Sequence, residues 1–344
     1  MTEPLRIGAR TSPLARAQVD LVVALLAKRG VESTVVGITT KGDQDQRHLT
    51  EIGGTGVFAS AVRDALRAGE IDLAVHSLKD LPTSQPDDLE ILAIPEREDC
   101  RDVLVGCRLD QLGNGSTVGT GSPRRALQLQ EWGRSHGIQL AVKPIRGNVE
   151  TRLRKVASGE VDAVILAAAG LCRLGYLDLQ ASNGQGIDRS NTAEITHAQI
   201  NSMPAHVLAL ATMLPAPGQG ALALEVHQNL SFDLRAEIAA LDNLVARAEC
   251  LVERGFLATL EAGCTAPVGA RAVVNSVRGT SLDLTLAAVI GRTLLSSLSE
   301  PLNGAPALRL EVHGSTSDPA GYGVSAAGRV LHELPNLQRA RHAE

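Results

Sequence analysis

Residues 69–75 read GEIDLAV, residues 159–165 read GEVDAVI, and this repeated pattern decides the fold. In each copy, a glycine suited to ending a helix is followed by a short apolar run typical of a buried parallel strand. The first run continues into HSLKDLP at residues 76–82, and the second into LAAAG at residues 166–170. Because ligands of α/β domains bind where parallel strands end, the repeat predicts two related domains whose strand ends form a site.

A second pair of segments supports the repeat. A short strand predicted at residues 5–7 is followed by GARTSP, and the corresponding segment at residues 119–123 reads GTGSP. Serine before proline is typical of a helix N-terminus, because serine caps the first turn and proline fits its first position. We therefore predict an α/β protein with two similar doubly wound domains around a cleft, like periplasmic binding proteins, and a small α+β C-terminal domain.

Changes in composition suggest where these domains begin and end. The charged segment REDCRD at residues 97–102 is where we place the hinge into the second domain, and LPAPGQG at residues 214–220 suggests a rigid return crossing. Residues 177–205 lose apolar periodicity and predict an insertion or long loop. The predicted domains are residues 1–97 with 217–240, residues 98–216, and residues 241–344. The last should contain a helix to about residue 260, strands such as 281–290, and a helix near 323–334.

Composition and charge exclude several classes of protein. The 344 residues carry a net charge of −5, and only 2% are aromatic, which argues against single-stranded nucleic acid as a partner. No apolar run reaches about 18 residues and the N-terminal residues lack a secretion signal, so we expect no membrane span and a cytoplasmic location. Five widely spaced cysteines without a CxxC pair indicate free thiols rather than disulfides or a zinc site.

Five arginines fall at or just past the ends of short apolar runs: Arg124, Arg125, Arg146, Arg152 and Arg173. Arginine can bind a carboxylate or phosphate with two hydrogen bonds, and a basic cluster in an acidic chain is typical of a focused anion site. The alternative is a set of helix-surface arginines paired with Glu150 and Glu160. Because all five lie near predicted strand ends, the pattern favours the anion site.

Two side chains are the main candidates for chemistry. Asp80 follows the first repeated strand, where a carboxylate can act as acid, base or cation stabiliser, although it can equally cap a helix or form a salt bridge. Its neighbour Lys79 could bind an anion or form a Schiff base, whereas we interpret His76 as a packed or loop histidine. Cys264 lies in a glycine-containing loop and could be a nucleophile, a covalent attachment point or a small buried residue.

Taken together, these segments resemble the porphobilinogen deaminase family, also called hydroxymethylbilane synthases. The motifs occur in the family's order: RTSP at 10–13, HSLKDLP at 76–82, GTGSPRR at 119–125, RGNVETR at 146–152, AGLCRLG at 169–175, PAPGQG at 215–220 and EAGCTAPVG at 261–269. The sequence departs from the family pattern at Thr55, where many members have lysine, and at Cys172 and Ala262. None of these departures changes Asp80, Cys264 or the arginines.

The resemblance implies a transferase of tetrapyrrole biosynthesis that joins four porphobilinogen molecules head to tail, releases ammonia and frees linear hydroxymethylbilane. A dipyrromethane cofactor attached to Cys264 through a thioether would be the primer, and Asp80 would be the catalytic carboxylate. Cofactor-binding residues would be Lys79, Thr120, Ser122, Arg124, Arg125 and Arg146. Substrate-binding residues would be Arg10, Ser12, Phe58, Arg152, Arg173 and Gln219. No metal is implied, and we expect a monomer whose product passes to uroporphyrinogen-III synthase.

Three other functions fit parts of the sequence. An anion-binding solute-binding protein or sensor would explain the arginines and the repeat, but it leaves the third domain and the Cys264 loop unexplained. A cysteine hydrolase requires a histidine partner for Cys264, and none lies within about 35 residues along the chain. An inactive member of the family would keep the fold without the activity.

Overall fold

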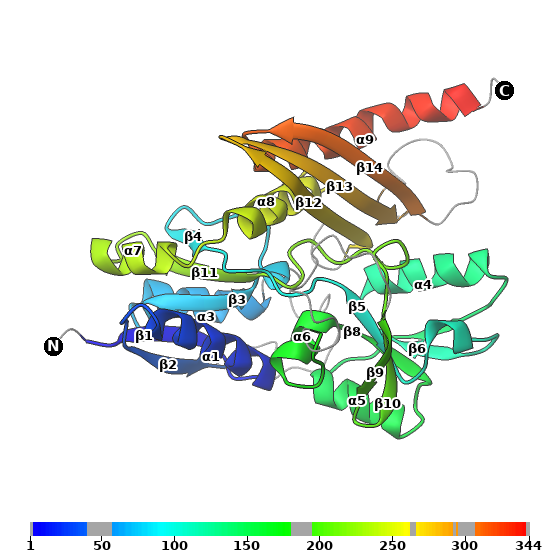
Figure 1. Cartoon of the computed structure of the whole chain (residues 1–344), viewed down its shortest axis with the longest axis horizontal. Coiled ribbons are helices and arrows are strands. Elements are labelled where there is room, and N and C mark those ends of the chain that lie inside the picture. Colours follow the sequence, from blue (N-terminus) through cyan, green and yellow to red (C-terminus); the bar gives the residue numbers. More distant parts are fainter. Residues whose placement is uncertain are drawn as a thin grey trace.

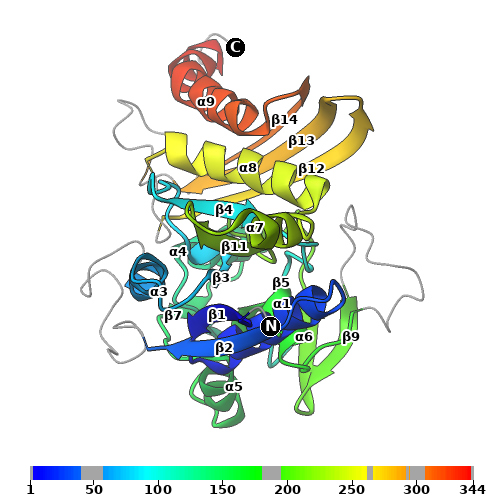
Figure 2. The ribbon, with the colours of Figure 1, turned by 90° about the vertical axis from the view of Figure 1, so that its left-hand side faces the viewer.

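The computed structural model describes residues 3–39, 57–179, 195–261, 266–291, 294 and 307–341, and at 57–58, 195–197 and 332–341 it describes the backbone alone. These residues form three sheets (Figure 1). The first two sheets lie next to each other. The third sheet stands over them, separated from the first domain by helix α8 (Leu244–Thr259) (Figure 2).

The first domain combines two helices with strands from two distant parts of the chain: β1 (Leu5–Arg10), α1 (Pro13–Ala27), β2 (Ser33–Ile38), α3 (Val57–Arg67), β3 (Leu73–Ser77), β4 (Leu89–Ala93) and β11 (Leu222–His227). The strand order is β2-β1-β3-β11-β4, with the first three strands parallel and β11 antiparallel to both of its neighbours. Val75 packs on the α1 side of the sheet and Ala74 on the α3 side, because successive residues of a strand face opposite sides.

The second domain repeats this plan: β5 (Asp102–Val105), η2 (Leu109–Gln111), β6 (Thr117–Gly119), α4 (Pro123–Ser135), β7 (Ala141–Lys143), α5 (Val149–Ala157), β8 (Ala163–Ala167), α6 (Ala168–Arg173), β9 (Ile195–Ile200) and β10 (Met203–Val207). Its strand order is β7-β6-β8-β5-β10-β9. Strands β7, β6 and β8 are parallel and β5 is antiparallel beside β8, as β11 is beside β3. The predicted pair of similar doubly wound domains is therefore confirmed.

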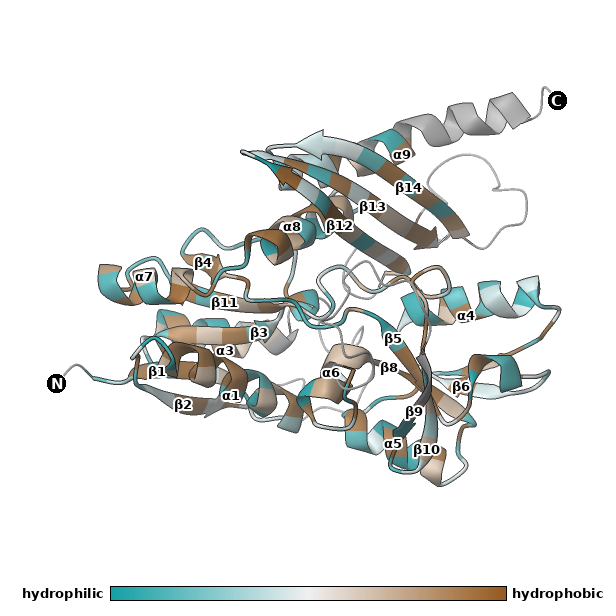
Figure 3. Ribbon diagram, viewed as in Figure 1, coloured by the Kyte–Doolittle hydropathy of each residue, from teal (hydrophilic) through white to brown (hydrophobic). Residues whose placement is uncertain are grey.

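The third domain is a three-stranded antiparallel sheet covered by helices: α7 (Phe232–Ala239) precedes it, and α8, β12 (Val268–Arg278), β13 (Ser281–Gly291), β14 (Ala307–Thr316) and α9 (Pro319–Arg341) form it. Helix α8 is buried on two sides. Val252 and Phe256 pack against the third sheet, whereas Ala246 and Cys250 pack against the first domain. In Figure 3 the apolar residues follow the strands, and polar residues follow the outer faces of α4 and α5.

Short local signals explain where the helices begin. The Ser12 hydroxyl accepts a hydrogen bond from the backbone N–H of Ala15 and caps α1, and proline fills the first helical position. Asn148 and Asn243 cap α5 and α8 in the same way. The apolar run of each GE[IV]D repeat, residues 73–75 in β3 and 163–165 in β8, is buried because helices cover both faces of its sheet.

Two expectations differ from the structure. Residues 195–207, part of which we expected to be loop, form the β9–β10 hairpin. Its turn places Asn201 and Ser202 at φ 50° and 66°, the backbone of a tight two-residue hairpin, without the Asn-Gly pair that announces such a turn. Helix α9 also begins earlier and ends later than predicted. From the sequence we interpret residues 53–56, GGTG, as a glycine-rich turn and residues 41–48 as a polar loop, and both segments lie outside the described residues.

Candidate active site

Asp80 stands at the carboxyl end of β3. The strand ends at Ser77, and residues 78–80 form one turn of 3-10 helix, η1 (Leu78–Asp80). Leu78 is fully buried, and its backbone N–H donates to the carbonyl of Ala221, which fixes the turn against the start of β11. The two charged residues that follow, Lys79 and Asp80, are half-buried.

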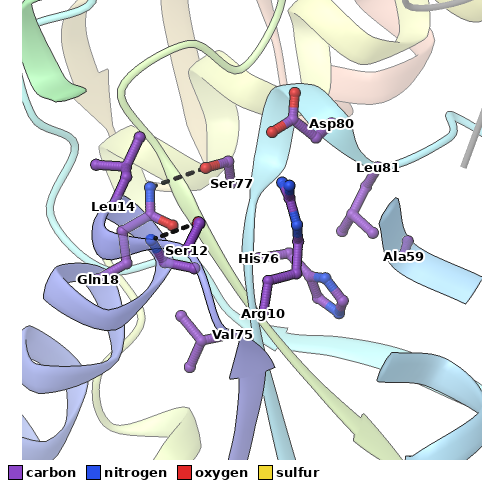
Figure 4. A pocket seen from close by; sticks show the side chains of 11 residues that line it. Arg10, Ser12, Leu14, Gln18, Ala59, Val75, His76, Ser77, Asp80 and Leu81 are labelled. Atoms are coloured by element: carbon purple, nitrogen blue, oxygen red, sulfur yellow. Dashed lines mark hydrogen bonds between the residues drawn. The ribbon is translucent and has the colours of Figure 1, made fainter. Parts of the chain in front are cut away.

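A cavity of about 60 Å³ lies beside this turn (Figure 4). Its polar lining comes from Arg10, Ser12, Gln18, His76, Ser77 and Asp80. Figure 4 shows the Arg10 side chain extending from the end of β1 toward Asp80. The Gln18 amide donates to the Ser77 hydroxyl at 2.8 Å, which ties α1 to the end of β3. The structure thus brings three predicted site residues, Arg10, Ser12 and Asp80, to one cavity.

The Lys79 side chain does not line this cavity and points toward the second domain instead. Its ammonium nitrogen Nζ lies 3.3 Å from Oε1 of Gln219. Burial lowers the pKa of Lys79 to about 8; Asp80 opposes this shift and the positive charge of Arg125 adds to it. Lys79 is therefore a cation whose charge changes near neutral pH, and it lies close to the arginines of the second domain.

Arg124 and Arg125 begin helix α4 and share one buried carboxylate, Asp102. Nη1 of Arg124 lies 2.7 Å from Oδ2, and Nη2 of Arg125 lies 2.7 Å from Oδ1. Burial by itself would raise the pKa of Asp102, but the two guanidinium groups lower it well below its usual range. Asp102 was not predicted from sequence. The signal was an aspartate at the start of an otherwise apolar strand, directly after the charged hinge.

The other three arginines come from α5, α6 and the loop before α5. Burial and the charges of Arg125 and Arg146 lower the pKa of Arg152 to about 10, so these three guanidinium groups are near one another. Burial also lowers the pKa of Arg173, against the attraction of Glu98. Such mutual repulsion is tolerated where a negatively charged ligand is to be bound.

Three of these guanidinium groups keep a buried donor without a hydrogen-bond partner among the described residues: Nε of Arg124, Nη1 of Arg146 and Nε of Arg173. A buried N–H that makes no hydrogen bond is costly, and native proteins seldom keep one without a reason. The donors therefore mark positions that carboxylate oxygens of a ligand can fill.

The remaining predicted residues are placed in different ways. The Gln219 side chain is buried, and its amide Nε2 donates to the Cys100 carbonyl at 2.8 Å and to Asp102 at 2.9 Å, so it joins the two crossings between the domains. The Thr120 hydroxyl accepts from the backbone N–H of Ser122. Cys264, Thr55 and the side chain of Phe58 lie outside the described residues, so their predicted places are not described here.

Comparison with known proteins assigns the chain to a family. Residues 5–232 match the dipyromethane cofactor binding domain of porphobilinogen deaminase, and residues 247–295 match its C-terminal domain. The chain belongs to the porphobilinogen deaminase family. Porphobilinogen deaminase 1 of Streptomyces coelicolor is 48% identical over 305 residues, covering 87% of each chain. Porphobilinogen deaminase of Mycobacteroides abscessus is 40% identical over 331 residues, covering 95% of this chain and 96% of the relative.

Among solved structures, the lipoprotein Tp32 from Treponema pallidum aligns with 70% of this chain and 91% of its own, at 12% identity and a TM-score of 0.40. No helix in the described part of this porphobilinogen deaminase family member has the length and apolar character needed to cross a membrane. The resemblance found in the sequence motifs is confirmed by the family matches.

Proposed function

We propose that this protein joins four porphobilinogen molecules into linear hydroxymethylbilane on a dipyrromethane primer attached to Cys264. The observation that carries the proposal is the set of buried guanidinium donors of Arg124, Arg146 and Arg173 that have no partner among the described residues. Lys79, the neighbour of Asp80, is close enough to Arg124 and Arg125 for their positive charges to lower its pKa. Each pyrrole of this pathway bears two carboxylates, so a chain of up to six rings brings up to twelve negative charges into the cleft. A cluster of arginines that repel one another is suited to that load.

The residues present fit the cofactor. Lys79, Arg124, Arg125 and Arg146 supply cationic donors for its carboxylates, and Thr120 and Ser122 lie at the start of α4, where backbone N–H groups favour anions. When bound, the cofactor supplies the nucleophilic pyrrole carbon to which substrate is added. All three nitrogens of Arg125 already donate to Asp102 or to the Ile165 carbonyl, so Arg125 acts through its charge and its two remaining N–H groups.

Asp80 is the residue we place at the reacting atoms. In each addition a C–N bond of porphobilinogen breaks, a C–C bond forms, and the hydrogen displaced from the accepting carbon leaves as the proton of ammonium. Positive charge develops on the substrate pyrrole as ammonia departs, and the Asp80 carboxylate can stabilise it and accept a hydrogen bond from the pyrrole N–H. Arg10 and Ser12, which line the same cavity, would hold substrate carboxylates there. We further propose a cytoplasmic monomer whose product passes to uroporphyrinogen-III synthase.

The first test is the intact mass of the protein purified from cells, compared with that of Cys264→Ser and of the control Cys172→Ser. We expect wild type and Cys172→Ser to exceed their sequence masses by two linked pyrroles, and Cys264→Ser to show no excess. If wild type shows no excess, either the protein was purified without its primer or the proposed function is wrong. Incubation with porphobilinogen distinguishes the two, because only a deaminase apoprotein gains the adduct. An excess of the same size in Cys264→Ser would contradict the attachment site.

A further inference from the structure

Asp102 is the carboxylate on which the arginine cluster is built. It is fully buried at the first residue of β5, and its two oxygens receive different donors. Oδ2 accepts from Nη1 of Arg124 at 2.7 Å. Oδ1 accepts from Nη2 of Arg125 at 2.7 Å, from Nε of Arg125 at 3.1 Å and from the Gln219 amide at 2.9 Å. One side chain thus gathers residues 22, 23 and 117 positions away.

The side chains of Arg124 and Arg125 can point to the same place only if another group attracts both of them. Consecutive residues of a helix point about 100° apart around its axis, so the side chains of Arg124 and Arg125 diverge unless something draws them together. Asp102, at the start of β5, supplies that attraction at the N-terminus of α4. Both arginines are almost completely buried, which leaves their side chains little freedom to find other partners.

The charges in this cluster do not cancel. Two guanidinium groups and one carboxylate leave one excess positive charge in a region from which water is largely excluded, where charges act strongly. Nε of Arg124 has no hydrogen-bond partner among the described residues, and the Lys79 ammonium is close enough to be affected by all three charges. The cluster therefore carries one net positive charge in a fixed position, which a negatively charged ligand can neutralise.

We propose that Asp102 is a positioning residue, which sets the directions of Arg124 and Arg125 and thereby determines how tightly the cleft binds the pyrrole carboxylates. The proposal rests on the function proposed above. Asp102 itself touches no substrate, because its side chain is fully buried and bonded to protein donors.

A matched control lies three residues earlier. Asp99 is also buried and accepts from the Arg101 side chain at 2.6, 2.9 and 3.1 Å. Both aspartates lie in the hinge crossing, and each would lose a buried negative charge on conversion to asparagine. A merely structural role predicts that Asp99→Asn and Asp102→Asn behave alike.

The experiment compares holoenzymes of wild type, Asp99→Asn and Asp102→Asn by thermal midpoint, by steady-state kinetics with porphobilinogen and by intact mass. The asparagine side chain of Asp102→Asn has an NH2 group in place of one carboxylate oxygen. This donor faces one of the two guanidinium groups and pushes that group out of its native orientation. We expect both variants to lose thermal stability, but only Asp102→Asn to raise KM about tenfold while kcat changes much less. Asp102→Asn purified without primer, beside a loaded Asp99→Asn, would also support the proposal. Equal KM values in the two variants would overturn it.

Asp102→Glu covers the case in which Asp102→Asn does not fold. Glutamate keeps the charge but moves the carboxylate by one methylene, so the directions of both arginines change while the charge balance does not. We expect a raised KM here as well, and a KM equal to that of wild type would overturn the proposal. Wild-type turnover is measured in parallel: if wild type does not consume porphobilinogen, the proposed function fails, and if it does, the variants test Asp102 alone.

Discussion

The turn that carries the Asp80 carboxylate is held in place by its buried neighbour Leu78. Leu78 fixes the turn at the end of β3, so replacing Asp80 by asparagine should leave the fold and the primer in place. An amide of the same shape cannot stabilise the positive charge that develops as ammonia leaves. We expect Asp80→Asn to reduce turnover of porphobilinogen by about 10²- to 10³-fold, with the mass of the loaded enzyme unchanged. Rates close to those of wild type would remove Asp80 from its assigned role.

Lys79 should give the reaction a pH dependence. Its pKa of about 8 means that the ammonium is mostly present at pH 7 and mostly lost at pH 9. If Lys79 binds carboxylates, KM for porphobilinogen should rise several-fold across this range. Lys79→Arg should flatten the profile, because a guanidinium keeps its charge throughout. A KM independent of pH in wild type, or one that rises equally in Lys79→Arg, would assign the carboxylate contact to other residues.

The same shift affects stability in a defined direction. The folded pKa of Lys79 lies below the ordinary value of 10.5, so between about pH 8 and 10.5 the unfolded chain binds more protons than the folded one. Stability from this group therefore rises with pH in that window, whereas binding of carboxylates falls. The two effects have opposite signs, so a loss of activity between pH 8 and 9 cannot be explained by Lys79-linked unfolding.

Among single residues, the sequence identified those whose role depends on local context. Asp80 and the five arginines were found because each follows a short apolar run that predicts a strand end. Asp102 was missed because its role depends on partners 22, 23 and 117 residues away. Gln219 was singled out as a substrate contact by resemblance, and that role stays a prediction, but its bonds to Cys100 and Asp102 also give it a structural role.

At the level of helices and strands, explicit capping residues made prediction reliable. Ser12 and Ser122, each before a proline, mark helix starts that the structure has at those positions, and the GE[IV]D repeat gave β3 and β8. The β9–β10 hairpin was missed because its turn uses two non-glycine residues with positive φ, Asn201 and Ser202, in place of the Asn-Gly pair that indicates such a turn.

The return crossing shows why a glycine motif can be predicted as rigid but not placed from sequence. Gly220 has φ 89°, and a Cβ there would lie 2.3 Å from the Glu98 carbonyl oxygen of the outward crossing. Its carbonyl accepts a hydrogen bond from Arg173 at 2.6 Å. The PAPGQG segment therefore needs glycine because two crossings and a site arginine meet there, a requirement that only the folded arrangement reveals.

In the whole molecule, a buried ionic network joins the third domain to the hinge. Both Glu253 oxygens receive the Arg97 guanidinium, at 2.7 and 2.9 Å. The same carboxylate accepts from the backbone N–H groups of Gly218 in the return crossing and Ala272 in β12. Glu249, one turn earlier on α8, accepts from Arg271 at 2.6 Å. One carboxylate of the third domain therefore bonds to both crossings between the first two domains.

We expect Glu253→Gln to uncouple the third domain, because it removes the nearer of the two carboxylates that pair with the buried Arg97, at a cost of about 3–5 kcal/mol. Urea unfolding can be followed by far-UV circular dichroism and by fluorescence of Trp132, the single tryptophan, which reports on the second domain. The two transitions should coincide in wild type and separate in Glu253→Gln. The control Glu237→Gln removes the exposed pair with Arg29, worth at most about 1 kcal/mol, and should keep them coincident. Coincident transitions in Glu253→Gln, with a midpoint like that of the control, would show that the network does not hold the domains together.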